Sequence, residues 1–282
     1  MQVAALLKTG AVVDAQLPDG CTALMVACEL GYEQCALALL KAGANVNHSI
    51  NDGRTALNLA CQNGHEQCAL ALLENGANAN YAKAYGWTAM MFACQNGHEQ
   101  CALALIKAGA AIDYMAPNGP TALMLSCQNG HEQCARALIK AGANLESKQN
   151  EGWTALMYSA QNGHEQCALA LIKAGADLEK QTAKGSTALN LACQNGHEQC
   201  ALELLKAGGD PNKANNDGWT ALMLAAFGNH EQCLRVLIEA KANLEVTQNQ
   251  GFTALMLCCQ NGHEKCALTL LRAAANIHWR TA

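Results

Sequence analysis

Short apolar stretches of similar length recur along the chain, each separated from the next by polar residues and glycine. One example starts at Gly86 and reads GWTAMMFACQNGHEQCALALIKAGAAIDYMAPN. The apolar residues of its first stretch predict a short helix over about 89–95, and CALALI predicts a second helix over about 99–107. The residues that follow predict an extended loop with turns.

Residues at the ends of the two predicted helices support this assignment. Thr88 is a suitable N-cap, because its hydroxyl can accept a hydrogen bond from an early helical amide. Gly97 and Gly109 lie where a left-handed residue would end each helix. Glu99 suits the positive start of the second helix, and Lys107 suits its negative end. Neither helix is long enough to be stable alone, so each must pack against neighbouring elements.

The same segment returns every 33 residues. The glycine that begins each copy is found at Gly20, Gly53, Gly86, Gly119, Gly152, Gly185, Gly218 and Gly251. Because no insertion or deletion interrupts the series, the sequence predicts an array of helix–turn–helix–loop repeats. The stability of such an array depends on each repeat and on its contacts with its neighbours.

The repeat resembles the ankyrin repeat. The resemblance rests on the 33-residue period, the opening G-x-T-x-L, the central GH and the closing L-L/I-x-x-G-A, and it extends over nearly the whole chain. It implies an all-α solenoid of stacked helix-turn-helix repeats joined by β-hairpin-like loops. We expect a single array over 1–282, with a partial N-terminal repeat at 1–16 and full repeats at about 17–49, 50–82, 83–115, 116–148, 149–181, 182–214, 215–247 and 248–282.

Two departures from the family pattern bear on the expected stability. The histidine that ankyrin repeats normally carry after T-x-L is Asn58 and Asn190 in two repeats and methionine in the others. Either asparagine can replace the bond to the neighbouring threonine, whereas methionine cannot donate one. Lys241 and Ala274 stand where the other repeats have their terminal glycine. If that position stays left-handed, each costs about 1 kcal/mol, so we expect the last two repeats to be the loosest.

Composition refines this interpretation. Hydrophobic residues make up 51% of the chain but aromatic residues only 4%, so the core must consist mainly of Ala, Leu, Cys and Met. The net charge of −5 gives no reason to expect nucleic-acid or membrane binding. The sequence shows neither an apolar window of about 18 residues nor a convincing signal peptide. Its 16 cysteines are therefore expected to be mostly free thiols in a reducing, cytoplasmic compartment.

The segment CQNGHEQC at 61–68 carries candidate chemistry and has a counterpart in every repeat. The first cysteine is alanine at 160 and 226, the histidine is Tyr32 in one copy, and the glycine is Asn229 in another. These changes preserve backbone geometry and small volume but would not preserve a set of metal ligands. We therefore interpret the cysteines as small buried hydrophobic residues. The histidines, each at a helix start, are expected to bond loop backbone.

A thiol-based metal-binding or redox module is the alternative, and it would use pairs such as Cys28 and Cys35 within one repeat. A zinc site needs about four converging ligands and usually contains close C-x-x-C pairs, which this sequence lacks. Buried thiols also tend to be inert. No other motif indicates a catalytic residue, so we expect a protein that is not an enzyme and that needs no metal or cofactor.

If the shared positions build the scaffold, function is expected where the copies differ. The residue after each leading glycine varies, and large side chains stand there in alternate repeats. Exposed Trp, Tyr and Arg are typical anchors of protein interfaces, although each tryptophan could instead lie flat on the next loop and pack the hairpin. The candidate partner-binding residues are Arg54, Tyr85, Trp87, Trp153, Trp219, Phe227 and Phe252.

The leading hypothesis is a monomeric, non-enzymatic scaffold that binds a protein partner of unknown identity through its concave, hairpin-bearing face. In contrast to the varied loop positions, a Gln–Asn pair recurs almost unchanged at the end of the first helix, for example at 62–63 and 95–96. This uniformity suggests a copied array, a repetitive partner or weak selection for one target. A third hypothesis, motivated by the lack of an evident polar C-terminal cap, is the recognition domain of a larger enzyme or effector.

Overall fold

The structure is a computed structural model and describes residues 12–82, 86–117 and 119–280. The chain forms two compact units, residues 1–144 (unit 1) and 145–282 (unit 2), and each is described by itself. In the described ranges the regular elements are α-helices and the short 3-10 helix η2 (Asn150–Gly152), with isolated antiparallel bridges at Gln16–Thr22 and Ser49–Thr55. The predicted all-α solenoid with hairpin-like loops is therefore confirmed.

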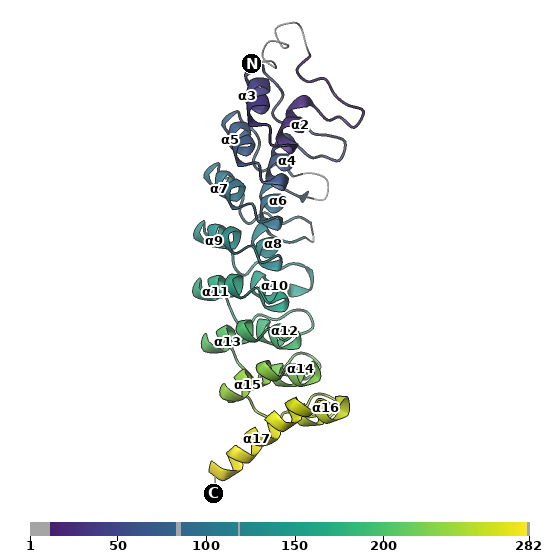
Figure 1. The fold of residues 1–282 in the computed structure, drawn as a ribbon, viewed down its shortest axis with the longest axis vertical. Coiled ribbons are helices and arrows are strands. Elements are labelled where there is room, and N and C mark those ends of the chain that lie inside the picture. The colour runs from purple at the N-terminus through teal and green to yellow at the C-terminus, as the bar shows by residue number, and fades with distance from the viewer. Residues whose placement is uncertain (1–11, 83–85, 118, 281–282) are drawn as a thin grey trace. The chain divides into compact units, whose positions relative to one another are not determined.

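Unit 1 stacks helix pairs in the order of the sequence. Each first helix packs against the first helix of the next repeat, and each second helix against the next second helix, so the helices form two layers with the loops beside the first helices (Figure 1). The first helices are α2 (Ala23–Glu29), α4 (Ala56–Asn63), α6 (Ala89–Gln95) and α8 (Ala122–Gln128). The second helices are α3 (Glu33–Lys41), α5 (Glu66–Glu74), α7 (Glu99–Lys107) and α9 (Glu132–Lys140).

Unit 2 has the same arrangement of alternating first and second helices. Its first helices are α10 (Ala155–Asn162), α12 (Ala188–Gln194), α14 (Ala221–Phe227) and α16 (Ala254–Asn261). Its second helices are α11 (Glu165–Lys173), α13 (Glu198–Lys206), α15 (Glu231–Glu239) and the longer α17 (Glu264–Arg280).

The core is built mainly from Ala, Leu, Cys and Met, as the composition predicts. A first helix such as α6 buries Met90, Met91 and Cys94, and a second helix such as α5 buries Cys68 and Leu72. Among the described core residues Phe92 is the only aromatic one. Alanine and cysteine at the contact positions let successive helices approach closely, which gives these short helices the apolar contacts that they lack alone.

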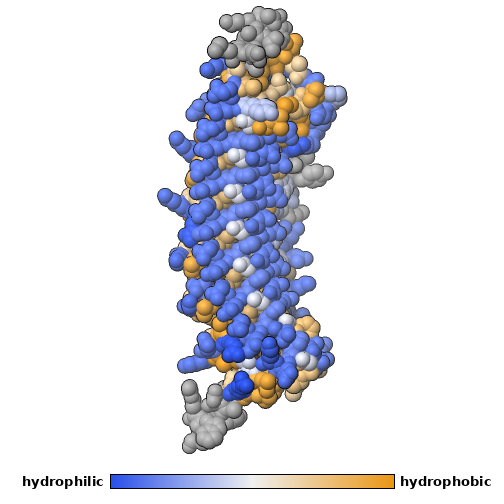
Figure 2. Space-filling view, in the orientation of Figure 1, coloured by the Kyte–Doolittle hydropathy of each residue, from blue (hydrophilic) through white to orange (hydrophobic). Residues whose placement is uncertain are grey.

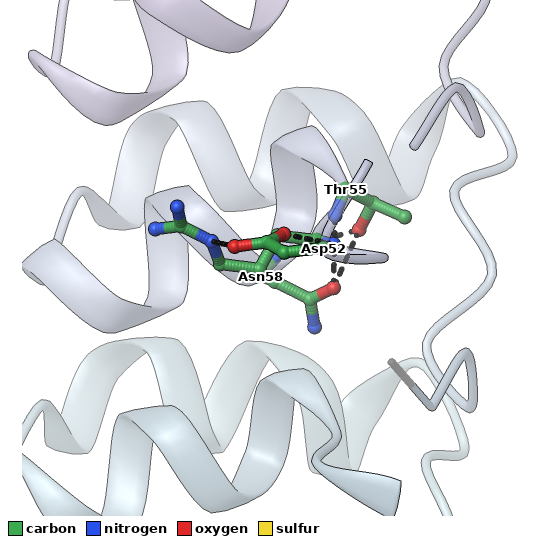
Figure 3. Close-up of polar contacts among 4 residues, drawn as sticks. Asp52, Thr55 and Asn58 are labelled. Carbon is green, nitrogen blue, oxygen red and sulfur yellow. Dashed lines mark hydrogen bonds and ion pairs between the residues drawn. The ribbon is translucent and has the colours of Figure 1, made fainter. Parts of the chain in front are cut away.

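Each first helix starts at a threonine whose hydroxyl accepts a backbone amide, as predicted from Thr88. Where asparagine follows, the cap is reciprocal: the Asn58 side-chain oxygen accepts the Thr55 backbone N–H at 3.0 Å, and Thr55 Oγ1 accepts the Asn58 N–H at 3.3 Å (Figure 3). Thr187 and Asn190 form the same capping box. In this cap the asparagine side chain accepts a hydrogen bond from the threonine backbone N–H. It therefore takes the place of the family histidine without having to donate a hydrogen bond there.

The two positions without the terminal glycine behave differently. Lys241 keeps the left-handed conformation, with φ of 61°. Asn229, which replaces the glycine of the GH motif, is also left-handed, with φ of 60°. The condition stated for these positions, that they stay left-handed, does not hold at Ala274. It lies inside α17, which continues to Arg280. The cost of a left-handed residue with a Cβ therefore applies to Lys241 and not to Ala274.

A second set of contacts ties each loop to the loop before it. The side-chain oxygen of Asn47 accepts the backbone N–H of Asn78 at 2.8 Å, and Glu146 accepts that of Asp177 at 2.8 Å, in each case 31 residues further on. The predicted partial repeat at 1–16 lies largely outside the described residues. Within the part that is described, Asp14 makes the same bond to the N–H of Asn45 at 3.0 Å.

Candidate protein-binding face

The repeated histidines join neighbouring repeats. Five of them donate from Nε2 to the carbonyl at the end of the preceding repeat's first helix, 36 residues earlier. The bonds are His65 to Glu29 (3.0 Å), His98 to Gln62 (3.1 Å), His131 to Gln95 (2.9 Å), His197 to Gln161 (2.9 Å) and His230 to Gln194 (3.1 Å). Their role in these repeats is to satisfy helix-end carbonyls. The sequence predicted a backbone partner without locating it in the preceding repeat.

The glycine of the GH motif is required by this contact. At Gly64, φ is +76°, and a Cβ would lie 2.5 Å from His98 Nδ1. Asn229 occupies the equivalent position one repeat before His263. There the His263 ring bonds through Nδ1 to the carbonyl of Ala226 at 3.0 Å, which lies 37 residues earlier in the chain rather than 36. The glycine therefore supplies both a left-handed backbone and room for the imidazole.

None of the 16 cysteines, all of which lie in the described residues, forms a disulfide, and 14 of them are buried, as the core-packing interpretation predicts. Cys35 is half-buried and Cys259 is exposed. Burial, and after it Cys68 of the next repeat, raises the pKa of Cys28, so the neighbouring thiol is not the Cys35 of the alternative pairing. Among the described residues, no three or more His, Cys, Asp or Glu side chains are grouped as a metal site would require.

Each tryptophan after a leading glycine is half-buried and contacts a second aromatic ring. Trp87 lies 5.2 Å from Phe92, Trp153 lies 5.1 Å from Tyr158, and Trp219 meets Phe227 edge-on at 5.5 Å, all between ring centroids. Sequence reasoning missed Phe92 and Tyr158. The available signal was that this first-helix position is aromatic only in two of the repeats that carry tryptophan.

The packing interpretation applies to Trp87. One part of its ring packs on a small core cluster of Met91, Ala116 and Leu125, together with Tyr114. Packing of this kind holds the ring in one orientation while leaving part of it open to solvent. Phe227 presents more surface, with 53% of the residue exposed.

The other candidate residues differ in how readily their side chains could contact a partner. Arg54 Nε contacts Asp52 Oδ2 at 2.7 Å, so its charge is already paired within its own loop. Phe252 is half-buried, and its carbonyl accepts the N–H of Gln248 at 3.1 Å, which closes the hairpin turn. Tyr85 lies outside the described residues.

Unit 2 has a small cavity beside the central tryptophan. Its volume is about 210 Å³, and it lies between the hairpin loops around Trp153 and Ser186. Gln161 and Gln194, two members of the uniform glutamine series, line it together with Lys184 and Leu191. The conserved spacing of the glutamines therefore places amide groups next to the aromatic ring.

A larger and mostly apolar cavity of about 480 Å³ lies at the N-terminal end of unit 1. It is lined by Leu17, Val26, Tyr32 and Leu39 among others. Figure 2 shows hydrophobic surface gathered at this end of unit 1, whereas much of the remaining visible surface is hydrophilic.

The family model described as "Ankyrin repeats (3 copies)" matches residues 47–116, 108–182, 143–215, 170–248 and 189–280, and the model "Ankyrin repeat" matches 19–51. The chain belongs to the ankyrin-repeat family. Ankyrin repeats are generally protein–protein interaction modules, and this fold is typically a non-enzymatic scaffold.

Among solved structures, the ankyrin-repeat chain is similar to the human ASB11 ankyrin repeat domain. The two share 25% sequence identity with a TM-score of 0.71, over 78% of this chain and 98% of that domain. No curated protein gives a significant match. Within the described ranges, no helix combines the length and the apolar character needed to cross a bilayer.

Proposed function

We propose that this ankyrin-repeat chain is a non-enzymatic scaffold that binds a protein partner through the aromatic pairs on its hairpin and first-helix face. The observation that supports the proposal most directly is that Trp87, Trp153 and Trp219 each contact a second ring and are held half-exposed. A rigid aromatic side chain loses little conformational freedom when a partner covers it, so it contributes strongly to affinity.

The groups around Trp153 suit the recognition of a peptide segment. The 210 Å³ cavity has room for one apolar side chain, and the Leu191 side chain offers it an apolar wall. Gln161, Gln194 and Ser186 can exchange hydrogen bonds with the backbone of the same segment. An apolar centre surrounded by polar groups is the usual composition of a protein interface.

We rank the remaining candidates by this geometry. Phe227 and Phe252 extend the aromatic surface in unit 2, whereas Arg54 is expected to contribute less, because its ion pair with Asp52 must be rearranged first. Tyr85 remains a candidate on sequence grounds. We propose that the chain acts as a cytoplasmic monomer without a cofactor. The recognition domain of a larger enzyme or effector would use the same face, so it predicts the same binding residues.

The test is a comparative affinity capture from lysate of the source cells, followed by direct binding with the purified partner. The baits are the intact chain, a Trp153→Ala/Trp219→Ala variant, and a Leu103→Ala control on the exposed side of α7. Circular dichroism confirms that all three remain folded. The proposal predicts a protein retained by the intact chain and the control and lost by the double variant. Equal binding of the purified partner to all three would refute it.

A further inference from the structure

A negative and a positive side chain line the cavity beside Trp153. They belong to Glu151 and Lys184, which precede Gly152 and Gly185 at the tips of consecutive hairpin loops. Both residues are exposed, and within the described ranges neither forms an ion pair with the other or with a third residue. A carboxylate and an ammonium group that line one cavity without pairing are available to a ligand that carries both charges.

Hydrogen bonds join the two hairpin tips. The backbone carbonyl of Glu151 accepts the N–H of Ala183 at 2.6 Å, which ties the first tip to the second. The second tip is closed on itself, since Thr182 Oγ1 accepts the N–H of Ser186 at 3.2 Å. Thr182 and Ser186 are both 8% exposed. The two charged residues are therefore carried by hydrogen-bonded backbone on both sides of the cavity.

The backbone at Glu151 has a conformation that the matching positions do not share. Its φ is 64°, in the left-handed region, although the residue has a Cβ. Lys184, Asp217 and Gln250 occupy the same place in the other hairpins of unit 2, and none of these three has a positive φ. Strained non-glycine residues gather at ligand-binding sites, where the strain helps to present a side chain. The outlier therefore singles out the hairpin tip beside Trp153.

The spacing of these groups fits an extended segment of a partner. In such a segment the side chains of residues i−2, i and i+2 point to the same face, and the outer two are about 13 Å apart. Helices of neighbouring repeats pack about 10 Å apart. Long side chains at i−2 and i+2 can therefore reach the two tips while the side chain of residue i enters the cavity.

We propose that the partner segment carries the pattern basic–x–apolar–x–acidic, read in either chain direction. The basic group pairs with Glu151, the apolar side chain lies against Trp153, and the acidic group pairs with Lys184. This inference rests on the proposed function and adds the chemistry of the partner to it. Complementary charges of this kind act mainly on specificity, because a like charge at either tip is repelled.

The test uses three peptides that differ only in the two charged positions: KSLSE, KSLSK and ESLSE, each with Gly-Ser flanks and blocked ends. Binding to the full chain is followed by saturation-transfer difference NMR of the peptide's leucine methyl signals. This measurement detects millimolar affinities and needs no tryptophan signal, so it serves every variant equally. We expect KSLSE to bind about three- to tenfold more tightly than either like-charged peptide at low salt.

Charge reversal at the tips gives a sharper test. Lys184→Glu makes both tips acidic and should shift the preference to KSLSK, whereas Glu151→Lys makes both basic and should shift it to ESLSE. Asp217→Lys is the matched control, because it changes the net charge as Glu151→Lys does, at a tip that does not line this cavity. It should leave the order of the three peptides unchanged. Glu151→Lys is expected to fold, since Lys241 is left-handed with φ of 61°, and circular dichroism checks each variant.

The outcomes separate this inference from the proposed function. Equal binding of all three peptides that is lost in Trp153→Ala would overturn the charge pattern and leave the aromatic site intact. Charge selectivity that persists in Trp153→Ala would support the pairing at the tips and contradict the aromatic site. Binding of none of the peptides to the folded chain would overturn the inference, as would an order that Asp217→Lys changes as much as Glu151→Lys does.

Discussion

Replacing Gly64 with alanine tests how neighbouring repeats are held together. The substitution should lower the free energy of unfolding in two ways, and the structure allows each to be considered separately. The first is backbone strain, because φ at Gly64 is +76°, and a residue with a Cβ pays about 1–2 kcal/mol there. The second is the contact with the next repeat, since the new Cβ would lie 2.5 Å from His98 Nδ1.

If the imidazole moves away, the 3.1 Å bond from His98 to the Gln62 carbonyl is lost, at about 0.5–1.5 kcal/mol. The expected total for Gly64→Ala is therefore about 1.5–3.5 kcal/mol. Gly43→Ala provides the matched control. Its φ is +85°, but no atom lies within 4 Å of the added Cβ, so only the backbone term of about 1–2 kcal/mol applies.

The assay is native-state hydrogen exchange of the amides in α4 to α7, compared with urea unfolding followed by circular dichroism. Local exchange is needed because long repeat arrays do not unfold in one step. A Gly64→Ala/His98→Ala double variant should lose less stability than the two single changes added together, since without the ring there is no clash. Equal costs for Gly64→Ala and Gly43→Ala, together with strict additivity, would refute the reasoning.

Three further outcomes follow from the caps and the thiols. Asn190→Ala removes the capping box with Thr187 and should destabilise unit 2 by about 1–3 kcal/mol in urea unfolding; an unchanged midpoint would contradict this. Cys259, the exposed cysteine, should react first with a thiol reagent at pH 8, and peptide mapping after brief labelling checks it. Burial raises the pKa of Cys200 from 9.0 to about 12. Its contribution to stability is therefore complete below pH 9 and lost as pH rises toward 12, so Cys200→Ala should weaken the alkaline fall in the urea midpoint.

The local structure of each repeat could be predicted from the sequence because its signals are local. The helices expected over 89–95 and 99–107 are α6 and α7, and the threonine caps and left-handed glycines lie where the motif indicated. The outcome at Ala274 could not be predicted from residue type, because Lys241 at the equivalent position also has a Cβ and yet stays left-handed.

The contacts between repeats could not be predicted in the same way. Cys28 and Cys35 are close in sequence, yet Cys28 meets Cys68, because a helix start and a helix end in one repeat face different neighbours. The acceptor of each histidine, 36 residues earlier, is likewise set by how the repeats stack. Trp87 illustrates what can and what cannot be predicted from the sequence. The sequence identified the residue, whereas its packing on Phe92 depends on the fold of the loop.

The contacts between repeats have a consequence for how the gene can change. Each bond reaches only the adjacent repeat, and its partner recurs 33 residues away. Loss of residues 62–94 by recombination would bring His98 to the carbonyl of Glu29 and Cys101 to Cys28, the groups that His65 and Cys68 now contact. A deletion one residue shorter or longer would misalign all of these contacts at once. The array can therefore vary in length by whole repeats, and selection should tolerate only those steps.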